Sequence, residues 1–108
     1  MALTREFRQT VLARAQADPA YRVAMLTEAV GAFLSGEMGV GKTMLRDYIN
    51  ATIGFEALAL EMNKNSKSLQ RMLGPAGNPT AENIFAILRV LQEYESVRLS
   101  VTSSQDAA

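Results

Sequence analysis

Residues 36–43 read GEMGVGKT and match G-x-x-x-x-G-K-[ST], the pattern of loops that cradle the phosphates of nucleotides. Such a loop lies between a buried strand and a helix, whereas residues 24–35 before it have helical spacing. The fold also needs several parallel strands and an acidic residue that holds magnesium, and we find one strand candidate, near the end of the sequence. We therefore interpret residues 36–43 as a glycine-rich turn between two helices. Lys42 and Thr43 then open the second helix, and Lys42 points into solvent.

A second stretch, residues 63–74, carries side chains that suit contacts with DNA. It has three cations and no acid, a local +3 in a chain whose 11 basic and 11 acidic residues cancel. Glutamine can pair with adenine and arginine with guanine through two hydrogen bonds, while serine is permissive. Lys64, Thr80 and the backbone amides at helix starts could hold phosphates. The candidate DNA-binding residues are Lys64, Asn65, Ser66, Lys67, Ser68, Gln70, Arg71 and Thr80.

The spacing of this region predicts two short helices, over residues 55–62 and 66–73, joined by a tight turn. Ala59 is small, which lets the second helix cross close to the first. Asn63 stands where the turn needs a left-handed backbone, and Asn65 or Ser66 can cap the second helix. Leu69, Met72 and Leu73 then face the core. The alternative is an ordinary helical hairpin whose charged face is simply solvated.

Other elements must hold this pair in place. Hydrophobic periodicity predicts further helices over residues 4–17, 19–35, 42–51 and 81–94. Thr4, Asp18 and Thr80 are suitable N-caps, and Pro19 suits a first helical position. We divide the chain into an N-terminal helical pair (1–35) and a DNA-binding domain (42–94) within one compact unit. The apolar residues of the N-terminal helical pair either complete the core or bind a protein partner. These residues are Phe7, Val11, Tyr21, Met25 and Phe33.

Residues 96–102 change to a period of two, which is strand spacing. Val97, Leu99 and Val101 alternate with polar residues. One short strand cannot satisfy its own backbone. It can lie extended on its own domain, pair with the same strand of a second chain across a two-fold axis, or add to a sheet of a partner toxin. We favour pairing with a second chain, which makes these three residues candidates for dimerisation.

The composition excludes several classes of site. The chain contains neither cysteine nor histidine, which excludes disulfides, thiolate or imidazole zinc sites and a Ser-His-Asp triad. No apolar run approaches the ~20 residues that span a bilayer, and charged residues near the N-terminus argue against a signal peptide. We expect a soluble, cytoplasmic protein that is not an enzyme and needs no cofactor.

The C-terminal half resembles the helix-turn-helix antitoxins and transcriptional regulators of the HigA and Xre-like group. The residues that carry the resemblance are Leu58-Ala59, 67–73, 77–80 and 98–101, with 45–50 similar to the lead-in helix of a subgroup. The Gly-Asn-Pro-Thr turn after an Arg-x-Leu helix is the most specific element. The resemblance implies an all-α, λ-repressor-like helix-turn-helix bundle. This chain would add two N-terminal helices and a short C-terminal β-strand.

The same resemblance implies a DNA-binding homodimer that represses its own operon through double-stranded operator DNA. Many members also neutralise a toxin of the RelE-like ribonuclease type, as the antitoxin of a type II toxin-antitoxin pair. The chain departs from the pattern at Asn63, where glycine is usual, and at Gln70, where many relatives carry an aromatic residue or histidine. One alternative is a protein-interaction module that mainly neutralises a toxin. Nucleotide binding through residues 36–43 is a third.

Overall fold

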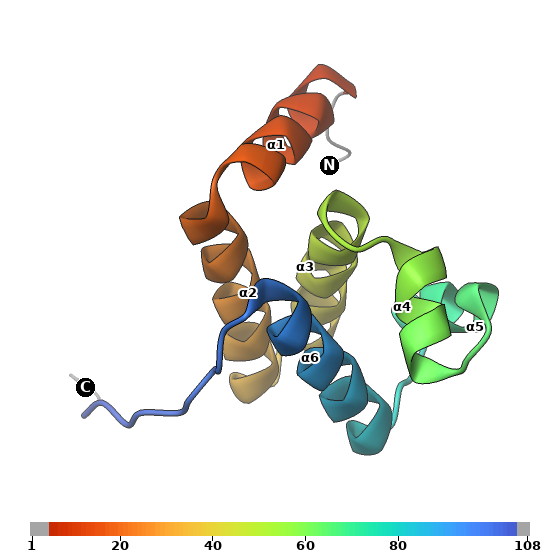
Figure 1. Ribbon diagram of the computed structural model, residues 1–108. Helices are drawn as coiled ribbons and strands as arrows, with labels where there is room; N and C mark the ends of the chain where they lie inside the picture. The colour runs from red at the N-terminus through yellow and green to blue at the C-terminus, as the bar shows by residue number, and fades with distance from the viewer. Residues whose placement is uncertain (1–4, 106–108) are drawn as a thin grey trace.

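The computed structural model describes residues 5–105, and within them the chain is all-helical (Figure 1). The helices are α1 (Arg5–Ala17), α2 (Pro19–Leu34), α3 (Met38–Ala51), α4 (Phe55–Met62), α5 (Ser66–Met72) and α6 (Ala81–Glu95). The expected N-cap Thr4 lies outside the described residues. No helix among residues 5–105 is both long enough and apolar enough to cross a membrane.

One hydrophobic core joins α2 to the C-terminal helices. Leu26 and Ala29 of α2 lie in the same buried cluster as residues from α3, α4, α5 and α6. Tyr48 and Leu45 of α3 are fully buried near its centre. Helix α2 therefore belongs to the body that supports α4 and α5, because it covers α3 along one side (Figure 1).

Helix α1 projects away from this body (Figure 1). Ala15 is its only residue among the described buried positions, and Phe7 is 53% exposed. The expectation that Phe7 completes the core is therefore wrong, whereas Met25 and Phe33 of α2 do pack against the core. The Arg14 guanidinium lies 4.7 Å from the centre of the Tyr21 ring, which ties the end of α1 to α2.

Local capping explains where two of the helices begin. The Asp18 carboxylate accepts hydrogen bonds from the amides of Ala20 (3.1 Å) and Tyr21 (3.3 Å), and Pro19 follows it at the first helical position. The hydroxyl of Thr80 accepts a hydrogen bond from the Asn83 amide at 3.1 Å. Both caps confirm the sequence prediction, because each depends only on residues within one turn.

Helix α3 begins earlier than expected, at Met38 rather than Lys42. The left-handed Gly36 (φ 80°) ends the turn after α2, and the Gly41 amide already donates to the Glu37 carbonyl at 2.9 Å. A Cβ atom on Gly41 would lie 2.5 Å from the Phe33 ring, so the glycine allows α2 and α3 to approach. Of the glycines that seemed to form one loop, Gly36 thus makes the turn and Gly41 serves helix packing.

The C-terminal strand predicted over residues 96–102 is absent from the structure, since residues 97–105 have no regular secondary structure. The alternation itself is visible at the start, where Val97 and Leu99 are half-buried and Arg98 and Ser100 are exposed. Val101 is 79% exposed, and the segment leaves the body (Figure 1). An extended segment becomes a strand only when a second backbone supplies the ladder, and a single chain offers none here.

Candidate nucleic-acid interface

The turn between α4 and α5 has the geometry that the sequence predicts. Asn63 adopts the left-handed conformation (φ 54°, ψ 47°), and the Lys64 amide donates to the Ala59 carbonyl at 2.9 Å. Ala59 is buried between the helices, as its small side chain suggested. Because asparagine tolerates this backbone better than most residues, the usual glycine is not required.

Helix α5 is fixed at its start by Asn65. The Asn65 Oδ1 atom accepts hydrogen bonds from the amides of Lys67 (2.9 Å) and Ser68 (3.2 Å), so Asn65 rather than Ser66 is the N-cap. Leu69 and Leu73 are fully buried, which orients one face of the helix inward. Asn65 therefore acts first as a structural cap, and only its amide nitrogen remains for other contacts.

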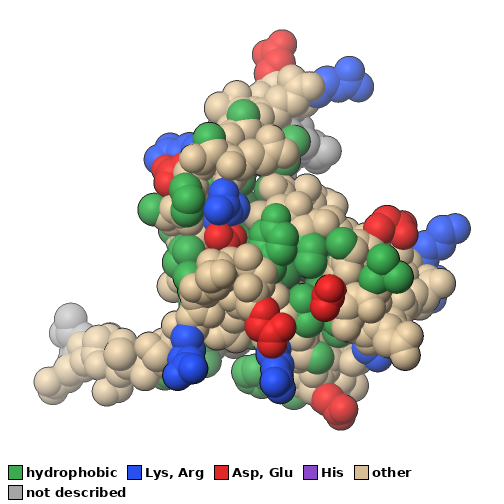
Figure 2. All heavy atoms as spheres, viewed as in Figure 1, with side chains coloured by type: hydrophobic (Ala, Val, Ile, Leu, Met, Phe, Trp, Pro, Cys, Tyr) green, Lys and Arg blue, Asp and Glu red, His purple; other side chains and the backbone are tan. Residues whose placement is uncertain are grey.

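The opposite face of α5 gathers most of the candidate residues on one exposed surface. The exposed members are Lys64, Asn65, Lys67, Ser68, Gln70 and Arg71. Ser66 is half-buried, and its hydroxyl accepts a hydrogen bond from the Gln70 amide at 3.1 Å. On the face drawn in Figure 2, basic and acidic side chains are interspersed, so a broad basic surface is not seen there. Any attraction for DNA must come from this local set.

Thr80 stands apart from that surface, at the start of α6. Its oxygen accepts the Asn83 amide, while its hydroxyl hydrogen remains able to donate. The residue is exposed and is joined to α5 by the loop of residues 73–79. Whether Thr80 and α5 can contact one ligand thus depends on how firmly this loop is held.

Lys42 is buried, with 8% of its surface exposed, and the expectation that it points into solvent is wrong. Its Nζ atom donates to the carbonyls of Gly77 (2.7 Å) and Gly74 (3.1 Å). One turn later, Arg46 Nη1 donates to the Leu73 carbonyl at 3.0 Å. The lysine of the apparent phosphate loop is thus bound to main-chain oxygens, and the preceding residues 38–41 are helical. This geometry is not that of a nucleotide-binding loop.

A buried polar cluster that sequence reasoning missed joins α2, α3 and the end of α6. Arg22 Nε donates to both carboxylate oxygens of Glu95 (3.0 and 3.1 Å), and the Tyr48 hydroxyl donates to Oε1 at 2.6 Å. Arg22 Nη1 also donates to the Ala15 carbonyl at 2.8 Å, which anchors the end of α1. The sequence held one signal: an acid at a helix C-terminus opposes the helix dipole and needs a compensating partner.

The cluster changes the pKa values of its members. Burial alone would raise the pKa of the Glu95 carboxyl, but hydrogen bonds from Arg22 and Tyr48 and the charge of Arg22 lower it overall. Burial raises the pKa of the Tyr48 hydroxyl, and the hydrogen bond to Glu95 and its charge raise it further. The cluster is therefore stable as carboxylate, guanidinium and neutral phenol across the neutral pH range.

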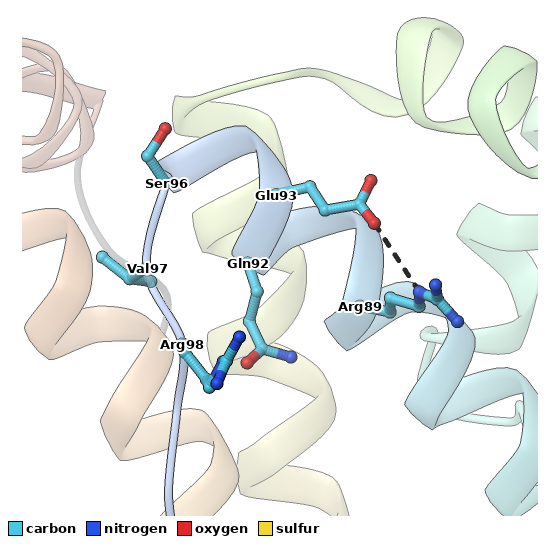
Figure 3. A pocket seen from close by; sticks show the side chains of 6 residues that line it. All are labelled: Arg89, Gln92, Glu93, Ser96, Val97 and Arg98. Atoms are coloured by element: carbon cyan, nitrogen blue, oxygen red, sulfur yellow. Dashed lines mark ion pairs between the residues drawn. The ribbon is translucent and has the colours of Figure 1, made fainter.

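The three candidate dimerisation residues lie on the segment that follows α6. Ser96 ends the helix in a left-handed conformation (φ 57°), and the Leu99 amide donates to the Gln92 side-chain oxygen at 2.8 Å. Beside the segment lies an open groove of about 690 Å³ (Figure 3), lined by Arg89, Gln92, Glu93, Ser96, Val97 and Arg98. Five of these six residues are charged or polar, and Arg89 and Glu93 form an ion pair at 3.6 Å.

The residues with the strongest candidate chemistry therefore form two groups. An exposed surface surrounds α5, and an extended C-terminal segment lies beside α6. Among protein-family models, curated proteins and solved structures, no match to this chain is found.

Proposed function

We propose that the protein is a sequence-specific DNA-binding regulator in which α4 and α5 form a helix-turn-helix. The observation that carries the proposal is the two-sided character of α5. Leu69 and Leu73 anchor one face in the core, while Lys67, Gln70 and Arg71 project from the other. A rigidly anchored helix with an exposed polar and cationic face suits insertion into a major groove.

Charge supports the same reading. The turn and helix of residues 63–74 contain cations and no acid, although the whole chain is neutral. Phosphate contacts would supply most of the affinity, and binding should weaken steeply as salt rises. Lys64 lies in the turn and suits a phosphate contact, whereas Gln70 and Arg71 suit contacts with base edges.

Arg71→Ala is expected to weaken binding by roughly 1–3 kcal/mol and to relax base preference, because arginine reads guanine through two hydrogen bonds. Lys64→Ala is expected to weaken binding to all sequences similarly and to reduce the salt slope by about 1. The measurement is fluorescence anisotropy on duplex DNA from immediately upstream of the protein's own gene, with random-sequence competitor and a salt series. Wild-type binding that is no tighter than binding to random DNA would overturn the proposal.

A regulator of this kind gains affinity and specificity as a dimer that reads two half-sites about one helical turn apart, roughly 34 Å. The segment of residues 97–102 supports a dimer, because it leaves the helical body (Figure 1), the Leu99 amide is held by the Gln92 side chain, and open space lies beside it. Pairing with the same segment of a second chain would satisfy the backbone groups that one chain leaves to water. We therefore assign Val97, Leu99 and Val101 to a dimer interface.

Leu99→Pro should yield monomers that bind operator DNA weakly, because proline removes the amide that Gln92 holds and blocks strand pairing. Size-exclusion chromatography with light scattering at micromolar concentration measures the oligomeric state directly. Ser103→Pro, beyond the proposed strand, controls for a proline in this segment and should remain dimeric. Circular dichroism shows whether Leu99→Pro, which also loses a side chain packed against the core, is folded. A stable Leu99→Pro dimer would remove this segment from the interface.

Exposed aromatic residues favour a second candidate, binding to a partner protein such as a toxin. Phe85 on α6 is 68% exposed, and α1 leaves Phe7 largely accessible. Hydrophobic side chains also gather between α6 and α4 on the face shown in Figure 2. Co-purification with the product of the adjacent gene would support an antitoxin role. Retention of that complex by Lys67→Ala/Arg71→Ala would show that the two functions use different surfaces.

A further inference from the structure

The hydrogen bonds of Lys42 and Arg46 show that these side chains do not bind a nucleotide phosphate, and they also suggest what the two residues do instead. The two side chains lie four residues apart and thus on one face of α3. Together they donate to three carbonyls at the end of α5 and in the loop after it: those of Leu73, Gly74 and Gly77. We call this set of contacts the α3 clasp.

The carbonyls at the end of a helix have no partners inside the helix, and cations placed there are favourable. Helix α5 has only seven residues and packs mainly against α4, and Leu73 at its far end is buried in the core. The part that this packing does not hold is the loop that follows Leu73. Gly74 also accepts the Gly77 amide at 3.0 Å, which folds the loop into a tight turn above Lys42. The clasp therefore fixes this turn to the most buried helix of the domain.

The turn is the connection between the two places where DNA contacts are proposed. Arg71 precedes it on α5, and Thr80 follows it at the start of α6. Phosphate contacts set the register of a protein on DNA, and they do so only if their spacing is constant. A loop that is free to move would let the end of α5 shift relative to α6.

We infer that Lys42 and Arg46 are positioning residues for DNA recognition, which rests on the proposed function. They contact no DNA themselves, and they act by holding the loop of residues 73–79. A pocket of about 250 Å³ opens beside the clasp and is lined in part by Lys42, Arg46 and Gly74. Water can enter there, so removal of a donor should loosen the loop without unfolding the domain.

The test compares Lys42→Met, which keeps the aliphatic stem but loses the donor, with Lys42→Arg, which can still donate to two carbonyls. Arg46→Gln, at a half-buried position, is a second variant in case Lys42→Met does not fold. Circular dichroism first identifies a temperature at which each variant is folded. Amide hydrogen exchange at Gly77 and anisotropy on the upstream duplex and on random duplex are then measured at that temperature.

In the Lys42→Met variant, the Gly77 amide hydrogen should exchange at least about tenfold faster than in the wild type. The variant should bind the upstream duplex about tenfold more weakly and the random duplex with unchanged affinity. The Lys42→Arg variant should keep an exchange rate and an affinity for the upstream duplex close to those of the wild type. Exchange and binding within twofold of wild type in Lys42→Met, or in Arg46→Gln if that variant is the one that folds, would overturn the positioning role. If the wild-type protein itself does not distinguish the two duplexes, the proposed function fails and the DNA role of the clasp fails with it. The exchange result then still decides whether the clasp holds the loop.

Discussion

Gly77→Ala should lower the free energy of unfolding by about 3 kcal/mol, one of the largest effects expected of any single methyl group in this protein. A Cβ atom on Gly77 would overlap the carbonyl oxygens of Met72 and Arg71, which are backbone atoms and cannot rotate away. The loop would have to leave the end of α5, and Lys42 would lose its shorter hydrogen bond, at 2.7 Å. Urea denaturation monitored by circular dichroism measures the change.

Two other glycines provide matched controls. A Cβ atom on Gly74, in the same loop, would come no closer than 3.3 Å to the Arg71 carbonyl oxygen, so Gly74→Ala should cost much less. Gly39 lies in the first turn of α3 with nothing within 4 Å of its would-be Cβ, and Gly39→Ala should stabilise the protein by up to about 0.5–1 kcal/mol, the value for a helix interior. Equal stability of Gly77→Ala and wild type would mean that the loop is not held against α5.

Glu95→Ala should destabilise the protein by about 3 kcal/mol at neutral pH, because it leaves the buried Tyr48 hydroxyl and the Arg22 Nε atom without their acceptor and removes the charge that pairs with Arg22. The Glu95 side chain is only 5% exposed, so water cannot readily replace it. Glu93→Ala on the same helix is the matched control. It removes an exposed ion pair with Arg89 and should change stability by less than about 0.5 kcal/mol.

The effect of Glu95→Ala should also depend on pH with a definite sign. Because folding lowers the pKa of Glu95, its contribution is complete above the ordinary pKa of a glutamate and is lost as pH falls through the lower pKa of the folded state. The stability difference between wild type and Glu95→Ala should therefore be constant near pH 7 and shrink in acid. Urea denaturation midpoints of both proteins, measured from pH 7 down to pH 3, give this stability difference at each pH. A difference that stays constant over the whole range would show that the Glu95 charge contributes nothing.

Local sequence signals predicted much of the helical framework. Asp18, Asn63 and Thr80 each occupy the cap or turn position expected of them, and α4 has the predicted bounds. The exposed face of α5 could also be predicted, because Leu69 and Leu73 fix which side of a short helix is buried. These features depend on residues within one or two turns of each other, where side-chain chemistry and helical period act directly.

Other features could not be read from local patterns. The period of residues 96–102 predicted a strand that the structure lacks, since a ladder needs a second backbone that the pattern does not specify. Only the alternation of burial over residues 97–100 follows the pattern. Phe7 has the spacing of a core residue, yet α1 extends beyond the body that would cover it. Amphipathic spacing shows that a helix has an apolar face, but it does not show which part of the protein packs against that face.

The sequence by itself determined the helical framework up to residue 95 and a short, capped helix with a cationic outer face, but it wrongly added a C-terminal strand. Only the tertiary structure decided which partners Lys42, of the apparent phosphate loop, and the Glu95 carboxylate bind. Lys42 finds its acceptors 32 and 35 residues away, and Glu95 meets Tyr48 and Arg22 across 47 and 73 residues. A buried charge takes whichever partners the packed helices bring to it, because an unpartnered charge in the interior costs too much to persist.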